Sequence, residues 1–351
     1  MQLPNFRDIL YRLTSQATHQ ALQNSANTDD ATYRFPVVVR SQTRAFLEAQ
    51  ATALGASMAG LSGSILDSVA ASQIEAVAYS SEGITSRFYL LLKEHGLSLP
   101  AAAEVLRELR ITAGDMSAPA VLLEKLTVQN IEWISNHFGV SYEWLAGSSD
   151  NAIPFRHGTW YKSQIAGAHR LVELSQGADS VNFCLVRRAG FEYENDSAKT
   201  YEASRPNAAE PEFYPVVRTW HRAGPQEEYE TFEAWDVGRW NYWRCREHIK
   251  IVVYFATHLA RLPSLDIRVS GLTLDPKTFA SLSEGKILLP TIFRSSGAIQ
   301  WHPDDFVEPS SHVAKDPAEW RRILSSADYA SDFKAFSGLL QSLEKAKNLE
   351  N

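Results

Sequence analysis

Apolar residues recur at helical spacing over residues 3–22, and the polar stretch QNSANTDDAT follows them. The apolar positions share one face of a helix and are Leu3, Phe6, Ile9, Leu10, Leu13, Ala17 and Ala21. We therefore expect residues 1–32 to form an N-terminal helix and a linker. The apolar face of this helix needs a partner, which is either the rest of the chain or a second copy.

The pattern changes at residues 33–40, YRFPVVVR, which are β-branched and aromatic and predict a strand. Pro36 places this strand at a sheet edge, because proline cannot donate a hydrogen bond to a neighbouring strand. Two helices follow, over SQTRAFLEAQATAL and SMAGLSGSILDSVAASQIEAVA, with Gly55 as the stop of the first and Ser57 as the cap of the second. The strand has no sequence neighbour, so it must pair with a distant segment or with another molecule.

Residues 33–80 resemble a ribbon-helix-helix domain in their single strand, in the turn A51-x-x-L54-G55-x-S57 and in the apolar pair Leu61 and Ile65. The resemblance implies that two copies pair their strands into a ribbon that enters the DNA major groove. The interface residues would then be Phe35, Val37 and Val39, and the DNA-contacting residues would be Arg34, Val38, Arg40 and Arg44. The alternative is a helical hairpin whose β-edge serves dimerisation only.

Residues 85–149 read as five short helices that stop at glycines, among them Gly96, Gly139 and Gly147. Ser98 is placed to cap the second helix, and Pro100 falls in its first turn. The segment I131-x-x-I134-x-x-x-F138-G139-V140-S141-x-x-W144-L145-x-G147 resembles the close of a lambda-repressor-like (XRE) helix-turn-helix domain. This resemblance implies an all-α bundle in which Phe138, Val140, Trp144 and Leu145 seal the core.

The same resemblance maps the DNA-reading helix to residues 116–126, MSAPAVLLEKL, with Ser117 and Lys125 as its contacts and with Arg107 and Arg110 as further candidates. Charge does not favour DNA here, because residues 85–149 hold five Lys and Arg against seven Asp and Glu, a balance of −2. The alternative is a bundle that serves as an interaction or spacer domain.

Residues 155–345 predict a mixed α/β domain of unknown role and resemble no family. Strand-like or buried apolar runs are SVNFCLVRR, EFYPVVRTWH, HIKIVVYFATHL, SLDIRVSGLTL and KILLPTIFRS, and PAEWRRILSSADYASDFKAFSGLLQSLEKAK predicts closing helices. The linker between this domain and the bundle is expected near SSDNAIP.

This half contains few candidate catalytic or metal-binding residues. Cys245 and His248 have a metal-ligand spacing, but one pair does not make a four-ligand site, and we interpret both as structural. His302, Asp304 and Asp305 indicate a turn, and Glu192 and Glu194 indicate the solvent face of a strand. We assign no catalytic residue and no metal ligand.

The most unusual stretch is aromatic and contains Trp235, Arg239, Trp240, Tyr242, Trp243 and Arg244. Such a cluster forms a core with cations at its rim, an interface or a stacking surface for bases. Trp240 and Trp243 are our candidates for interface residues.

Composition narrows the class of protein. The formal net charge is −7, so any nucleic-acid surface must be local, and two cysteines cannot build a disulfide framework. The sequence contains neither a signal-peptide pattern nor an apolar run of membrane-spanning length, so we expect a cytoplasmic protein without a membrane partner.

Together these patterns predict a multidomain α+β chain with a ribbon-helix-helix unit, an all-α helix-turn-helix bundle and a C-terminal mixed α/β domain. They predict a sequence-specific transcriptional repressor that binds operator DNA as a homodimer and needs no cofactor. Its C-terminal domain would sense an effector ligand, bind a protein or oligomerise. Two alternatives stay open: a nucleic-acid-acting enzyme with catalysis in the C-terminal half, and an interaction scaffold of the anti-repressor kind.

Overall fold

The computed structural model describes residues 38–203, 208–224, 227–295, 297–308 and 315–350, with the side chains of residues 67–82 and 347–350 excepted. The chain divides between Gly83 and Ile84 into two compact units, and each is described by itself. No helix in the described ranges combines the length and the apolar character that crossing a membrane requires.

The first unit contains α3 (Ser41–Leu54) and most of α4 (Met58–Glu94). Gly55 ends α3 in the left-handed conformation, at a φ of +64°, which glycine adopts without steric cost. The Ser57 hydroxyl then accepts a hydrogen bond from the Gly60 backbone nitrogen at 3.0 Å, which is the cap that the sequence predicts.

The expected break between the second and third predicted helices is absent, because α4 runs continuously from Met58 to Glu94. The stretch AVAYSSEGITSRF contains no proline, and a single glycine lowers helix stability without ending a helix. The separate helix starting near Thr85 is therefore wrong.

The second unit begins with an all-α bundle. It consists of the end of α4, α5 (Leu99–Val105), η1 (Arg107–Leu109), α6 (Ala113–Met116), α7 (Pro119–Lys125), α8 (Val128–Phe138) and α9 (Tyr142–Leu145). Phe138, Val140, Trp144 and Leu145 are all buried in its core, as the sequence predicts. The expected glycine stops also occur, because Gly96, Gly139 and Gly147 all have positive φ.

The rest of this unit is built on one open mixed sheet in the order β3-β2-β1-β5-β6, with β4 paired to β2. The strands are β1 (Ser180–Arg188), β2 (Glu212–Arg222), β3 (Glu228–Ala234), β4 (Gly238–Arg239), β5 (Ile267–Leu274) and β6 (Ile299–Trp301). β1 pairs with β5 in parallel, and the other pairs are antiparallel. The mixed α/β class expected for this half is confirmed.

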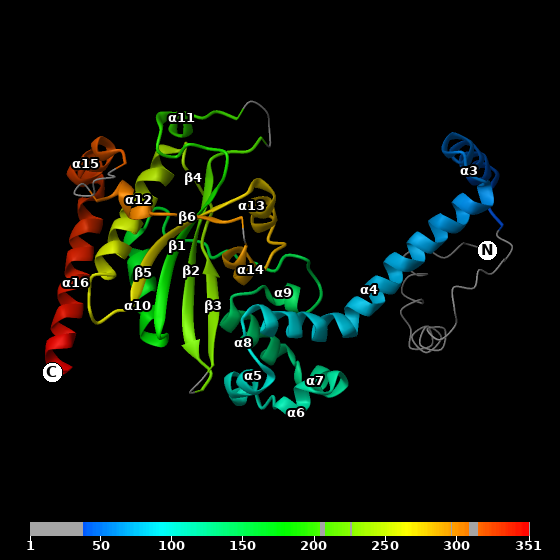
Figure 1. Cartoon of the computed structure of the whole chain (residues 1–351), viewed down its shortest axis with the longest axis horizontal. Coiled ribbons are helices and arrows are strands. Elements are labelled where there is room, and N and C mark those ends of the chain that lie inside the picture. The colour runs from blue at the N-terminus through cyan, green and yellow to red at the C-terminus, as the bar shows by residue number, and fades with distance from the viewer. Residues whose placement is uncertain (1–37, 204–207, 225–226, 296, 309–314, 351) are drawn as a thin grey trace. The chain divides into compact units, whose positions relative to one another are not determined.

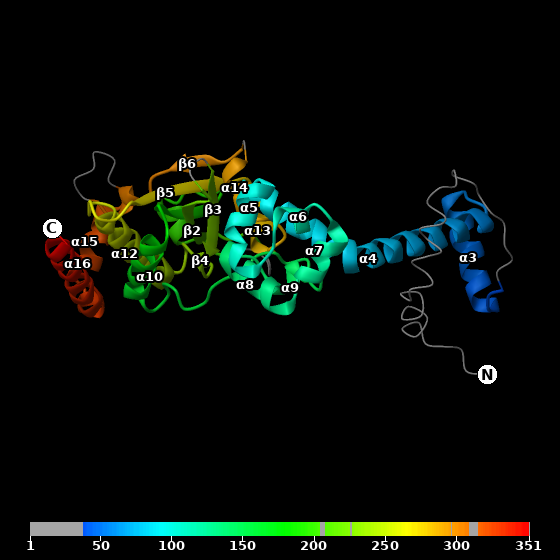
Figure 2. The same cartoon turned by 90° about the horizontal axis from the view of Figure 1, so that it is seen from below.

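Helices cover both faces of this sheet (Figures 1 and 2). The first face packs on α10 (Gln164–Gly177), α12 (Trp243–Leu259), α15 (Pro317–Ser325) and α16 (Ala330–Glu350), and contributes Val181, Phe183 and Leu185 of β1 to that core. The second face packs on α13 (Pro276–Ser283) and α14 (Leu289–Arg294), and contributes Cys184 and Val186. Alternate residues of one strand thus serve two cores, as the two-residue period of a strand requires.

Two apolar runs that look strand-like are helices. HIKIVVYFATHL lies in α12 and KILLPTIFRS contains α14. The run in α12 is β-branched and reads as a strand locally, but burial against the sheet outweighs that propensity. Pro290 sits in the first turn of α14, where its missing N–H costs nothing.

Candidate functional site

The described part of the first unit, residues 38–66, exposes many large apolar side chains. Only Leu47 and Ala51 of α3 are buried, although the helix has 14 residues. Exposed large apolar side chains are Val38, Val39, Phe46, Leu54, Met58, Ile65 and Leu66. A helical hairpin that buries so little needs a partner to be stable.

The residues predicted to form the ribbon lie at the start of this unit. Arg34, Phe35 and Val37 fall outside the described residues. Val38, Val39 and Arg40 have no strand partner among the described residues, and Val38 is 97% exposed. Arg40 is exposed and extended, at φ −68° and ψ 154°, so a ribbon formed with a second copy stays a prediction.

Arg44 is the second cation of this segment. It lies in the first turn of α3, and its Nε donates to Glu48 Oε1 at 2.9 Å. Both side chains are more than half exposed, so this ion pair is weak. Arg44 can therefore leave Glu48 and bind another anion.

The helix that the resemblance maps loosely to residues 116–126 is α7, which is shorter and runs from Pro119 to Lys125. Met116 belongs to α6. The helix begins late because a proline disfavours helical geometry in the residue before it, here Ala118.

The predicted DNA-contacting residues of the bundle are exposed or half-buried, and two of them bond to neighbouring residues of the chain. Arg107 pairs with Glu104 at 3.2 Å, and the Ser117 hydroxyl donates to the Ala113 carbonyl at 2.7 Å. Arg110 is exposed after η1, and Lys125 is half-buried at the end of α7. These four residues lie in or directly after three successive elements, η1, α6 and α7, rather than on one helix face.

Helix α8 of the bundle lies beside β3 of the sheet (Figure 1). The bundle and the sheet are joined by polar and aromatic side chains, His95, His137 and Tyr229, a seam that the sequence does not predict. His95 Nδ1 contacts the Glu230 carbonyl oxygen at 2.6 Å, and His137 Nε2 contacts the Tyr229 hydroxyl at 3.0 Å. A Cβ added to Gly139 would lie 1.8 Å from the Phe232 carbonyl oxygen. The C-terminal end of α8 is therefore fitted directly to β3.

Burial keeps the seam histidines neutral. Burial lowers the pKa of His95 to about 4, against the raising effect of the Glu230 carbonyl. Burial and the neighbouring His221 likewise lower the pKa of His137 to about 4. Both imidazoles act as uncharged hydrogen-bonding groups at neutral pH.

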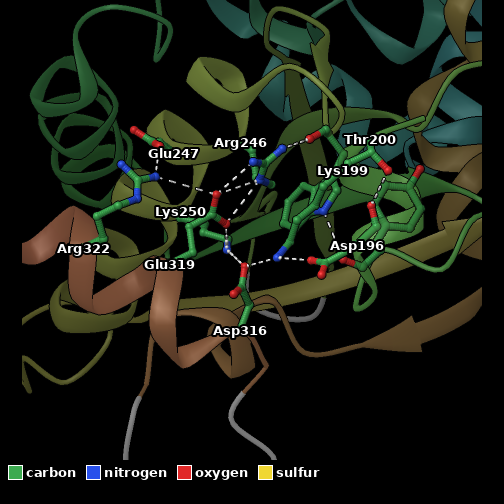
Figure 3. A network of polar contacts seen from close by, with 11 residues as sticks. Asp196, Lys199, Thr200, Arg246, Glu247, Lys250, Asp316, Glu319 and Arg322 are labelled. Atoms are coloured by element: carbon green, nitrogen blue, oxygen red, sulfur yellow. Dashed lines mark hydrogen bonds and ion pairs between the residues drawn. The ribbon is translucent and has the colours of Figure 1, made fainter. Parts of the chain in front are cut away.

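A charged network on the first face of the sheet joins α12 to α15 (Figure 3). Lys250 is 1% exposed, and its Nζ lies 3.1 Å from Asp316 Oδ2 and 2.5 Å from Glu319 Oε2. Arg246 also binds Glu319, with its Nη2 at 2.9 Å from Oε1. Lys199, from α11 (Asp196–Lys199), lies 2.6 Å from Asp316.

A second carboxylate extends this network, since Glu247 accepts from Arg322 (Figure 3). Glu247 also accepts from the Tyr329 hydroxyl at 2.6 Å. Burial alone would raise the pKa of Asp316, but its hydrogen bond with Glu319 and its contacts with Lys199 and Lys250 hold this pKa well below the usual range. Each buried charge in this network has an opposite partner, so its evident role is to fix α15 on α12. The signal in the sequence is Lys250 inside the apolar run HIKIVVYFATHL, with Arg246 four residues before it.

The remaining candidates from the sequence have structural positions. Cys245 and His248 lie in the first turns of α12, and the Lys162 backbone nitrogen donates to His248 Nδ1 at 3.2 Å. No three His, Cys, Asp or Glu side chains gather into a possible metal site within the described ranges. Asp304 and Asp305 lie in the short helical turn η2 (Pro303–Phe306), in agreement with the predicted turn.

The aromatic cluster divides between core and surface. Trp235 and Trp240 are at most 2% exposed and belong to the core, so the prediction of Trp240 as an interface residue is wrong for this fold. Its indole nitrogen donates to the Tyr193 carbonyl at 3.0 Å, which satisfies its one polar atom. Trp243 is 45% exposed under Arg244 and stays a candidate interface residue.

Comparison with known proteins gives no match: no family model, no curated protein and no solved structure resembles this chain significantly. Its function therefore has to be argued from its own residues.

Proposed function

We propose that the protein is a homodimeric DNA-binding regulator whose DNA contacts come from the first unit. The observation that carries the proposal is the exposed apolar surface of residues 38–66 beside the exposed Arg40 and Arg44. A second copy of the chain would cover this surface and bring four arginines together. The second unit would serve as the body that senses a signal or binds a further partner.

The bundle has a different role in this proposal. Its segment α6–α7 exposes Ser117, Val121 and Glu124, a poor set for reading base edges, which usually takes Arg, Asn or Gln. Its helix α8 packs against β3 through His137 and Gly139 and is not free to contact DNA there. We therefore place no DNA contact in the bundle.

The proposal is tested with the full chain on DNA from upstream of its own gene, across a salt series. The Arg40→Ala/Arg44→Ala variant removes four cations from a dimer. If each contacts one phosphate, the slope of log affinity against log salt should fall by about 3–4. The matched control is Arg107→Ala/Arg110→Ala, which removes the same charge from the bundle and should leave the slope unchanged.

Two results would sink the proposal. One is a chain that sediments as a monomer at micromolar concentration, since the exposed surface would then have no second copy. The other is equal DNA affinity for the wild type and the Arg40→Ala/Arg44→Ala variant.

One observation favours a second candidate, an interaction scaffold. The bundle carries two more acidic than basic residues, and Val121 and Val128 are exposed on it. If no form of the chain prefers operator over random DNA while Val121→Asp blocks capture of a protein partner by the full chain, the scaffold is the better account.

A further inference from the structure

The second face of the sheet changes character along its strands. Near α13 and α14 it is apolar, with Val186, Val216 and Leu272 in the core. Further along the same face come Asn182 of β1, Arg218 of β2 and Ser270 of β5. Asn182 lies directly opposite Arg218 in the register, so these two side chains project side by side.

A cavity of about 210 Å³ opens at this point. Its walls include the polar residues Asn182, Arg218, Ser270 and Gln300, and Phe293 of α14 contributes an aromatic wall. The volume corresponds to roughly seven water molecules, which is room for a ligand of about ten non-hydrogen atoms.

The polar groups around the cavity are held in place. Asn182 is 9% exposed, and its Oδ1 accepts from the Ser270 hydroxyl at 3.0 Å. No hydrogen bond joins the Asn182 amide nitrogen to another described residue, and this nitrogen is not among the fully buried unpaired atoms. Its two N–H donors are therefore open to the cavity that Asn182 lines.

Arg218 is equally constrained. Its guanidinium carbon lies 4.4 Å from the Trp220 ring centroid and 5.2 Å from that of Phe293, and it forms an ion pair with Glu230. The buried Arg218 Nε has no hydrogen-bond partner among the described residues. The Arg218 side chain is thus held by two aromatic rings and an ion pair, and its Nε–H remains as a hydrogen-bond donor without an acceptor among the described residues.

The Cys184 thiol, which also lines the cavity, is unreactive here. Burial raises the pKa of Cys184 to about 12, against the lowering effects of Ser270 and Arg218. The thiol stays protonated and forms an apolar part of the lining. The cavity can therefore bind a ligand but offers no nucleophile from this residue.

We propose that this cavity binds a small monocarboxylic acid with an apolar or aromatic body. The carboxylate would accept from Arg218 and from the Asn182 amide, and the body would pack against Phe293 and Leu272. A single negative charge fits because Glu230 already balances part of the Arg218 charge, whereas a doubly charged phosphate would need more cations. This inference does not depend on DNA binding.

The test uses benzoate, which has nine non-hydrogen atoms, and its neutral isostere benzamide, each titrated into the full chain by calorimetry. Benzoate should bind at least about tenfold more tightly than benzamide. Arg218→Gln should weaken benzoate by roughly 10- to 100-fold, as expected for loss of a charged hydrogen bond. Arg222→Gln, on the same strand but outside the cavity lining, should leave benzoate affinity unchanged.

Gln300→Glu provides a variant whose folding is not in question, because Gln300 is exposed on the edge strand β6. It places a negative charge at the cavity and should weaken benzoate but not benzamide. Equal affinity for the two compounds, no heat from benzoate up to its solubility limit, or no effect of Gln300→Glu would overturn the proposal.

Discussion

Replacing Gly139 with alanine should separate the bundle from the sheet. Gly139 ends α8 at a φ of +67°, a conformation that costs an L-residue about 1–2 kcal/mol. In addition, the new Cβ would meet the Phe232 carbonyl oxygen at 1.8 Å, and ordinary contact begins only above 3.4 Å. Either β3 or the end of α8 must move by more than an ångström.

The size of the effect follows from these two terms. Overpacking against a fixed neighbour costs about 1–3 kcal/mol, so the total destabilisation should be about 2–5 kcal/mol. Gly96→Ala is the matched control, since Gly96 also ends a helix at positive φ (+78°) but has nothing within 4 Å of an added Cβ. It should cost only about 1–2 kcal/mol, the backbone strain alone.

The assay is urea unfolding followed by tryptophan fluorescence. All nine tryptophans lie at or after Trp133, so the signal reports the second unit only. Hydrogen exchange at β3 should also rise in Gly139→Ala and not in Gly96→Ala. Equal midpoints for the two variants would refute the close fit between α8 and β3.

Two further predictions concern buried charge. Burial holds the pKa of His95 and of His137 near 4 in the folded protein, whereas the pKa of histidine in the unfolded chain is about 6.5. As the pH falls from about 6.5 to about 4, only the unfolded state gains protons on these histidines. The free energy of unfolding of the second unit should therefore fall by up to about 3 kcal/mol per histidine. A urea midpoint that stays flat between about pH 7 and pH 4.5, or a His137→Gln variant as pH-sensitive as the wild type, would contradict this. Glu319→Gln should cost about 3–5 kcal/mol, because it leaves the buried Arg246 without a carboxylate partner and Lys250 with Asp316 alone. Glu284→Gln breaks an exposed pair and should change the free energy of unfolding by less than about 1 kcal/mol. Equal unfolding midpoints for these two variants would refute the argument.

The sequence predicts the local features well. Helix stops at Gly55, Gly96 and Gly139 follow from the conformational freedom of glycine, and the two-sided strand SVNFCLVRR follows from its near-continuous apolar run. Such features depend on neighbours within a few residues, so a linear pattern contains them.

The sequence does not reveal what depends on distant neighbours. His137 and Tyr229 are 92 residues apart, and nothing near either predicts their contact. The same holds for Lys250 and Asp316, whose ion pair allows charges inside the helix α12. The cavity beside Asn182 leaves one trace in the sequence, a polar residue within an apolar strand, but the arginine beside it comes from another strand.

The parallel pairing of β1 with β5 has a consequence for the synthesis of the chain. Val181 pairs with Ile267, so one edge of β1 stays unpaired during synthesis until a segment 86 residues later has left the ribosome. Until then β1, β2 and β3 form a meander whose open edge is an apolar strand, the kind of edge that recruits other chains. A chain that stops near residue 260 should therefore aggregate even though its meander is complete. The last quarter of the sequence, which contains β5, protects the nascent chain from aggregation by covering the open edge of β1.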